Sequence, residues 1–201
     1  MTLVDLTMAI DERMPTYPDD PKLELFSIAT IQNQGWNEQR ITLNSHFGTH
    51  IDAPFHMLEK GKKLTDFPLE TFMGEAIVLD AQGQHAIEPD LKNVKAHDIV
   101  FFCTGHTKKA YAKNFFKDNP VVTLNTAQQL IEKKVKIVGL DSYTPDNEPY
   151  DIHKLWFKHD ILIVENLVNL DQLVGKRFQC FILPLKIQDA DGAPCRVIGI
   201  L

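Results

Sequence analysis

The sequence predicts a strand-rich α/β fold, a mixed sheet or partly closed barrel with a few helices. Three observations support this prediction. Short apolar runs rich in β-branched and aromatic residues recur along the 201 residues, and most are bounded by Gly, Pro, Asn or Asp, as strands usually are. Helix signals are few. The chain also has no internal repeat or linker, so we expect one domain over residues 1–201.

Ten segments are predicted to be strands because apolar, β-branched and aromatic residues dominate them. In chain order they are Leu3–Ile10, Leu23–Ile31, Gln39–Ser45, Ala76–Leu79, Ile99–Cys103, Val121–Leu124, Lys136–Leu140, Ile161–Val164, Phe178–Leu185 and Arg196–Leu201. The sequences of these runs do not specify which strands pair with one another.

Three segments are predicted to be helical. The clearest is Thr126–Lys134, for which Asn125 is the expected capping residue. Gln128 completes a capping-box-like pair, and two lysines at the end of the segment suit the C-terminal dipole. Asp151–Lys158 and Glu88–Lys95 carry weaker helical signals.

Composition and charge argue against several classes of protein. The chain is 44% hydrophobic and 24% charged, with a formal net charge of −6, which is ordinary for a globular protein. No block of Lys or Arg offsets the negative charge, so no nucleic-acid partner is expected. The first residues lack the basic region of a signal peptide. No apolar run reaches the roughly 18 residues that span a bilayer, so no membrane partner is expected either.

The cysteines indicate a reducing compartment. Cys103, Cys180 and Cys195 are odd in number, widely spaced and without a Cys-x-x-Cys pair. A disulfide framework normally shows an even number of cysteines in a short secreted chain. We therefore expect free thiols and a cytoplasmic location, with Cys103 unreactive inside an apolar strand.

The most informative segment is residues 46–56, His-Phe-Gly-Thr-His-Ile-Asp-Ala-Pro-Phe-His. Its ligand-type residues all occupy even-numbered positions, and side chains alternate between the two faces of a strand. One face is therefore predicted to carry His46, His50, Asp52 and His56. The odd-numbered positions, including Phe55, are predicted to face the core. A lone strand histidine is usually structural, but four ligand-type residues on one face indicate a site for a metal such as Zn²⁺.

The spacing of this motif requires a bend. At about 3.3 Å per residue, His46 and His50 lie roughly 13 Å apart in a fully extended strand, near the limit for sharing one ion. Gly48, midway between them, can supply a bulge or kink that shortens this distance. Pro54 lacks a backbone donor and suits the end or edge of a strand.

Further ligands are expected from elsewhere in the chain. This face supplies at most three metal ligands, and its fourth ligand-type residue is a spare histidine. The best candidates are His153, in a predicted helix, and Glu165, which ends an apolar strand. A buried carboxylate there would be costly unless paired or metal-bound. A structural role for His153 and a solvent-facing Glu165 are the alternatives. Four histidines among charged or turn residues are predicted to lie on the surface: His85, His97, His106 and His159.

The motif also carries a family resemblance. Residues 46–56 match the pattern His-x-Gly-Thr-His-x-Asp-x-Pro-x-His at every fixed position, so the chain resembles the cyclase family of metal-dependent hydrolases, whose best-known members are bacterial kynurenine formamidases. The resemblance extends over most of the chain. Other similar segments are Met14–Asp20, Gly61–Lys63, Phe157–His159, Ile163–Leu167, Leu183–Leu185 and Asp189–Pro194.

The resemblance implies a cyclase-like swivelling β/β/α fold and a site for two divalent metal ions. By position in the family motif, His46, His50 and Asp52 would bind one ion. His153 and Glu165 would bind the second, and the carboxylates of Asp52 and Glu165 would bridge the two. The ligand types favour Zn²⁺, with Mn²⁺ as the alternative.

The resemblance further implies an amidohydrolase in which a metal-activated hydroxide attacks a small aryl formamide such as N-formylkynurenine and releases formate. His56 would be the proton donor and acceptor, and Tyr17, where relatives often have Trp, would line the substrate pocket. Asp141–Asp146 differs from the Val-Pro-Ser-Val-Asp-Pro-like segment of the family's formamidases. Hydrolysis of a cyclic amide such as isatin and a non-catalytic metal-binding role are the alternatives. A homo-oligomer, dimer or tetramer, is expected.

Overall fold

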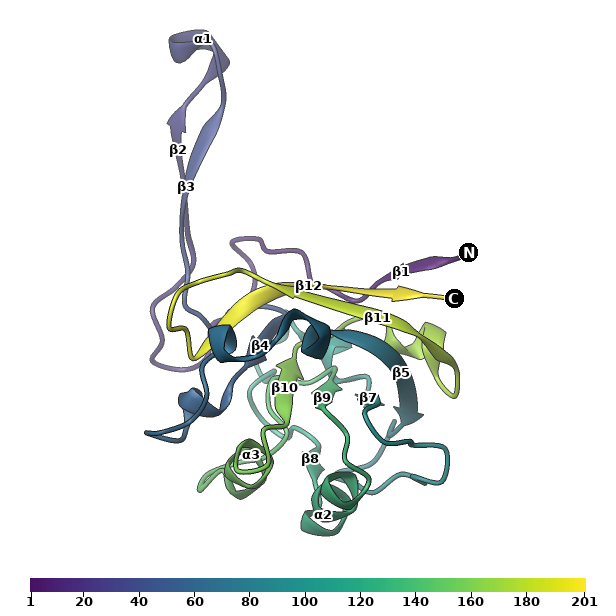
Figure 1. Ribbon diagram of the computed structural model, residues 1–201. Coiled ribbons are helices and arrows are strands. Elements are labelled where there is room, and N and C mark those ends of the chain that lie inside the picture. Colours follow the sequence, from purple (N-terminus) through teal and green to yellow (C-terminus); the bar gives the residue numbers. More distant parts are fainter.

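A computed structural model describes residues 1–201 and contains one large closed sheet (Figure 1). Its strands are β1 (Leu3–Asp5), β4 (His50–Asp52), β5 (Met73–Asp80), β7 (Ile99–Cys103), β9 (Ile137–Leu140), β10 (Leu162–Glu165), β11 (Arg177–Pro184) and β12 (Gly192–Ile200). They are ordered β1-β12-β11-β5-β7-β9-β10-β4, and β12 also pairs with β4. This second pairing closes seven strands into a barrel and leaves β1 outside it. The predicted strand-rich α/β fold is confirmed, with closure complete.

One half of the barrel is parallel and covered by helices. Strands β5, β7, β9 and β10 run parallel, and α2 (Leu124–Glu132) and α3 (Asp151–Phe157) lie against this half (Figure 1). All five residues of β7 are buried because both of its faces are covered. Trp156 of α3 is fully buried and donates a hydrogen bond to the carbonyl of Ala127 in α2, at 3.3 Å. None of the helices combines the length and the apolar character that a membrane-spanning helix needs.

The other half of the barrel is antiparallel, and no helix covers its outer face (Figure 1). Strands β1, β12, β11 and β5 form this half. Leu3 is opposite Ile200, and Phe181 is opposite both Ile198 and Met73. These apolar side chains are exposed or half-buried on the outside. The inward-facing side chains of the same strands belong to the barrel core, which includes the three free cysteines.

A hairpin arm projects away from the barrel (Figure 1). It consists of β2 (Glu24–Ala29), the single-turn helix α1 (Ile31–Gln34) and β3 (Glu38–Thr42). The two strands pair only with each other. All five residues of β3 are exposed, and α1 buries none of its residues. The arm therefore has no hydrophobic core of its own.

Smaller elements complete the chain. Strands β6 (Ala86–Ile87) and β8 (Val121–Val122) form a separate parallel pair. Short 3₁₀ helices cover Pro54–His56, Leu64–Asp66, Leu69–Phe72, His106–Lys109 and Leu170–Leu173.

Two helix predictions are corrected. Residues 88–95 form no helix, because the Asp90 carboxylate accepts the backbone N–H of Lys92 at 2.9 Å and stabilises a local turn instead. Helix α2 begins at Leu124, which was predicted to end a strand. Its capping residue is Thr123, whose hydroxyl accepts the N–H of Thr126 at 3.2 Å, rather than Asn125.

One histidine prediction is also wrong. His106 is only 5% exposed, and its Nε2 donates a hydrogen bond to the carbonyl of Phe115 at 2.8 Å. The ring packs against Phe115 and Tyr143, in an aromatic cluster that the neighbouring charged residues of the sequence do not reveal. His85, His97 and His159 are exposed, as predicted.

Candidate active site

The motif of residues 46–56 is not a continuous strand. Only His50–Asp52 form a strand, β4, and Pro54–His56 form a 3₁₀ helix. Gly48 adopts a φ of 64°, in the left-handed region that favours glycine, and turns the chain between the first two histidines. The predicted alternation of faces is therefore wrong along most of the motif, and Phe55 is 38% exposed rather than turned to the core.

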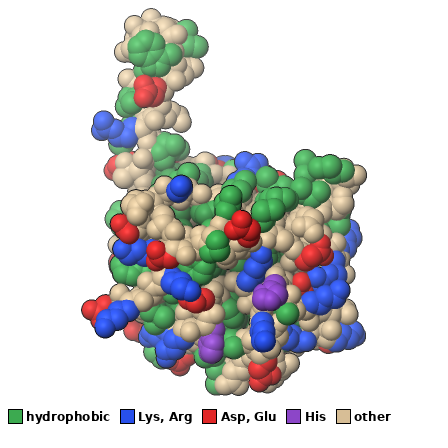
Figure 2. Space-filling view, viewed as in Figure 1, with side chains coloured by type: hydrophobic (Ala, Val, Ile, Leu, Met, Phe, Trp, Pro, Cys, Tyr) green, Lys and Arg blue, Asp and Glu red, His purple; other side chains and the backbone are tan.

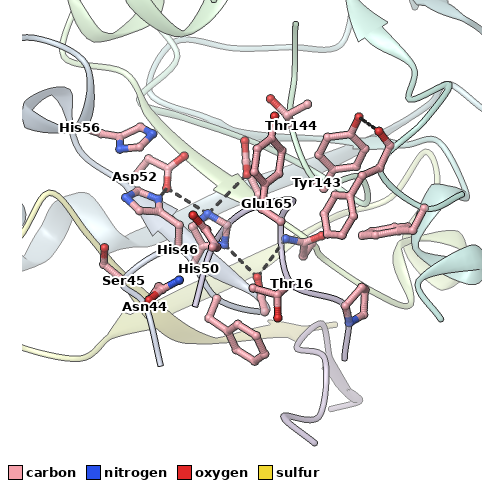
Figure 3. A pocket seen from close by; sticks show the side chains of 18 of the residues that line it. Thr16, Asn44, Ser45, His46, His50, Asp52, His56, Tyr143, Thr144 and Glu165 are labelled. Carbon is pink, nitrogen blue, oxygen red and sulfur yellow. Dashed lines mark hydrogen bonds and ion pairs between the residues drawn. The ribbon is translucent and has the colours of Figure 1, made fainter. Parts of the chain in front are cut away.

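The first group of site residues nevertheless converges as expected (Figure 3). Nδ1 of His46 lies 2.7 Å from Oδ1 of Asp52, and Nε2 of His50 lies 3.2 Å from the same oxygen. His50 donates its Nδ1–H to the carbonyl of Gly48 at 2.8 Å, so its Nε2 faces the cluster. Strand β4 lies between β10 and β12, which buries Asp52 almost completely.

The second group comes from α3 and β10. Antiparallel pairing sets Glu165 opposite His50, and Oε2 of Glu165 lies 3.4 Å from Nε2 of His50. Nε2 of His153 lies 3.4 Å from Oε1 of Glu165 and 4.0 Å from Oδ2 of Asp52. The five side chains expected to bind metal thus form one contiguous cluster, with the two carboxylates between the histidines.

The chemistry of this cluster fits divalent cations. Its donor atoms form two overlapping sets, and the atoms of each set lie within 4.8 Å of one another. One set consists of His46, His50 and Asp52, and the other of Asp52, His153 and Glu165. Oε1 of Glu165 is buried and has no hydrogen-bond partner. A buried carboxylate oxygen without a partner is costly, and a cation is the partner that would satisfy it. Imidazole and carboxylate groups are common ligands of divalent ions.

The pKa values of the histidines in the cluster also favour a cation site. Burial opposes charge on His153, but its hydrogen bond to Asp146 and the nearby carboxylate of Glu165 prevail and raise its pKa to about 10. Burial also opposes charge on His46, yet Asp52 and Asp191 raise its pKa to about 9. Protons therefore occupy these imidazoles when no cation is present. A divalent ion would displace them, because a metal-binding imidazole must be neutral.

His56 lies beside the cluster rather than within it (Figure 3). Its ring stacks on that of His46, with centroids 3.9 Å apart, and the centroid of the His153 ring is 6.4 Å away. Burial lowers the pKa of His56, so its imidazole is neutral near pH 7 and able to accept a proton.

A pocket of about 780 Å³ opens above these residues. The cluster, together with His56, lines one part of it, and an aromatic wall of Tyr17, Phe116 and Tyr143 lines another. The ring of Tyr17 meets Phe116 edge-on at 5.5 Å and lies 6.2 Å from Tyr143. Tyr17 remains 48% exposed, so its ring is accessible to a molecule in the pocket.

Comparison with known proteins identifies the family of this chain. The profile of the Cyclase family matches residues 4–147. This chain belongs to the Cyclase family. The kynurenine formamidase of Bacillus mycoides (strain KBAB4) is 30% identical over 202 residues, which cover 97% of this chain and 95% of that protein. The kynurenine formamidase of Bacillus cytotoxicus is 29% identical with the same coverage.

Solved structures show the same fold. A protein described as a predicted metal-dependent hydrolase from Bacillus stearothermophilus is 27% identical with a TM-score of 0.82, covering 98% of this chain and 97% of that one. Isatin hydrolase A from Ralstonia solanacearum superposes with a TM-score of 0.88 over 98% of this chain and 91% of its own. It is 23% identical, and the likeness concerns the fold alone. The predicted membership of the Cyclase family is thus confirmed.

Two acidic residues of this Cyclase-family site were not predicted. Oδ1 of Asp146 lies 2.5 Å from Nδ1 of His153, and its Oδ2 accepts the backbone N–H groups of Ile152 and His153. A carboxylate shortly before a predicted helix was the signal that could have revealed it. Oδ2 of Asp191 lies 2.7 Å from Nε2 of His46, across 145 positions in the sequence. No local pattern in the sequence links such distant residues.

Proposed function

We propose that this chain is a metal-dependent amidohydrolase that converts N-formylkynurenine, a small aryl formamide, to kynurenine and formate. The observation that carries the proposal is the buried cluster with an unpartnered Glu165 oxygen, which lies in a pocket with an aromatic wall. Relatives named kynurenine formamidase, similar over 97% of this chain, support the choice of substrate.

Two divalent ions, Zn²⁺ or else Mn²⁺, are assigned to the cluster. His46, His50 and Asp52 would hold one ion and His153 and Glu165 the other, with both carboxylates between them. When bound, such ions polarise an amide carbonyl and lower the pKa of a nearby water. The protein contributes the placement of these donors, which β4, β10 and α3 fix from three directions.

His56 is assigned the proton transfers. Its neutral imidazole accepts a proton from the attacking water and returns it to the departing nitrogen. An aryl amine is weakly basic, so the reaction needs only modest proton donation at that step. The position of His56, stacked on one ligand histidine and facing the pocket, leaves its ring free for this role.

The aromatic wall is assigned to binding of the aryl ring. Phe116 already packs edge-on against both Tyr17 and Tyr143, and a planar substrate ring can extend this arrangement. Contact of the aryl ring with these side chains would hold the formamide carbonyl toward the cluster and exclude bulk water.

Formate release from N-formylkynurenine is the test of this function. We expect turnover by the zinc-loaded protein, measured by coupled formate detection, with slower turnover of isatin measured by its loss of visible absorbance. Faster opening of isatin would favour the cyclic-amide alternative. A metal-loaded protein inert toward both amides would contradict the proposal and favour a binding role.

We also propose that the protein is cytoplasmic and that it is a homodimer. The three free, buried cysteines support a reducing compartment.

The hairpin arm supports the homodimer. An isolated two-stranded hairpin is at best marginally stable in water, so the projecting arm requires a partner surface. Figure 2 shows hydrophobic side chains on the arm and on the body beside it. A two-fold arrangement would place the arm of each copy on the uncovered β1-β12-β11-β5 face of the other. The exposed apolar side chains of the arm and of this face would then cover one another.

Replacement of Phe26 and Ile28 together by Ser tests this dimer. Both side chains belong to β2 and are about half exposed, at 52% and 48%. We expect a twofold fall in mass by light scattering after size-exclusion chromatography. Leu124→Ser is the matched control, because Leu124 is 55% exposed on the helix-covered side. A wild-type monomer, or dissociation in the control as well, would contradict the proposed interface.

A further inference from the structure

We propose that Asp191 is a positioning residue that fixes His46 with Nδ1 toward the metal cluster and thereby sets the metal affinity of the His46–His50–Asp52 group. The inference rests on the metal-dependent function proposed above. It concerns a side chain outside the five assigned ligands, in the residue that immediately precedes Gly192 and β12.

The three ligand histidines do not share one orientation. His50 is held through Nδ1 by the carbonyl of Gly48, and His153 is held through Nδ1 by Asp146. Both therefore present Nε2 to the cluster. His46 is reversed: Oδ2 of Asp191 holds its Nε2 at 2.7 Å, and its Nδ1 faces Asp52 at 2.7 Å. The acceptor at the outer nitrogen determines which nitrogen is free to bind a metal.

His46 also depends on its acceptor more than the other two histidines do. Its side chain is 20% exposed, against 3% for His50 and 3% for His153. It precedes β4 in a turn rather than lying in a strand or helix. Water can therefore compete for its outer nitrogen, and the backbone alone does not fix the ring. A charged acceptor is the stronger partner at such a site.

The backbone of β12 is shaped to admit this ring. A Cβ atom at Gly192 would lie 2.7 Å from Cε1 of His46 and 2.9 Å from the carbonyl oxygen of Ile51. Only glycine leaves that space, so the ring of His46 lies against the backbone while the preceding carboxylate holds its nitrogen. His56 stacks on the same ring at 3.9 Å. Asp191, Gly192 and His56 thus enclose His46 from outside the cluster.

Asp191 also faces the residue assigned to proton transfer. Its Oδ2 lies 3.5 Å from Nδ1 of His56, a separation longer than that of a good hydrogen bond. A single carboxylate therefore contacts a ligand histidine and its catalytic neighbour. His46, His56 and Asp191 also form a group of potential cation ligands. The experiment distinguishes the two roles of Asp191: loss of a metal ligand would remove one equivalent completely, whereas loss of a positioning residue only weakens its binding.

The test measures Zn²⁺ binding to metal-free Asp191→Asn and Asp191→Ala by competition with a chromophoric chelator. We expect one equivalent to weaken by roughly 10–100-fold, the effect typical of groups that orient metal-binding histidines. The second equivalent, at His153 and Glu165, should stay at wild-type affinity and so report an intact fold. Asp189→Asn is the control, because Asp189 lies two residues earlier and pairs with Lys63 on the surface, at 2.8 Å.

Nitrogen-15 NMR of the histidine rings supplies a readout that a purely structural role would not move. In the zinc-loaded wild type we expect His46 to carry the metal on Nδ1 and the proton on Nε2, with the opposite assignment for His50 and His153. Asp191→Ala should give His46 a mixed ring assignment. Unchanged affinity in both variants, metal on Nε2 of His46, or complete loss of one equivalent would overturn the proposal. None of these readouts requires formate release, so failure of the substrate assignment remains distinguishable.

Discussion

Asp52→Asn is expected to abolish formate release and to lower metal affinity by more than the roughly 100-fold upper range seen for groups that only orient ligands. Asp52 faces His46 and His50 through one oxygen and His153, at 4.0 Å, through the other. Asparagine keeps the shape but removes the charge shared by both proposed ions. It also sets an amide among histidines whose raised pKa values depend on that charge.

The measurement is metal content by mass spectrometry together with formate release, on protein whose fold is checked by circular dichroism. Breaking a buried ion pair can cost about 3–5 kcal/mol of stability, so Glu165→Gln is the companion variant. It removes a charge at an oxygen that has no hydrogen-bond partner. Asp160→Asn is the control, because Asp160 pairs with Lys62 at the surface. Full metal content and full rate in Asp52→Asn would refute the two-ion site.

His56→Ala is expected to keep its metal and lose activity by roughly 10²–10⁴-fold, the range typical of a lost general acid–base group. The ring stacks on His46 but lies in neither of the donor sets that combine Asp52 with His46 and His50 or with His153 and Glu165. Its removal should therefore leave metal stoichiometry unchanged. His159→Ala provides a surface control. Loss of one metal equivalent would make His56 a ligand, and an unchanged rate would remove it from catalysis.

Local patterns predicted the strands of the covered half of the barrel well. Strand β7 spans Ile99–Cys103, as predicted, because a run that is apolar at every position suits a strand buried on both faces. Residues 88–95 show the opposite case, since an aspartate formed a side chain–backbone turn within a weak helical pattern. Closure of the sheet depends on the pairing of β4 with β12, which are far apart in the sequence. A local sequence pattern carries no information about such a pairing.

The site was predicted in composition but not in shape. The alternation of residues 46–56 selected the side chains that converge, although β4 includes only His50–Asp52 and Gly48 turns the chain before it. Their convergence follows from the turn, the 3₁₀ helix and the strands beside β4. Asp146 and Asp191 escaped prediction because each acts through a histidine partner, and the contact between Asp191 and His46 spans 145 positions.

The most direct test of the central claim is a Zn²⁺ titration of the metal-free wild-type protein, with formate release from N-formylkynurenine measured at each step. The cluster of two carboxylates and three imidazoles predicts no activity without metal and a maximum at two equivalents per chain. Protons should be released as the imidazoles lose them to the metal. Full activity in the metal-free protein, or a maximum at one equivalent with no second binding step, would contradict the account.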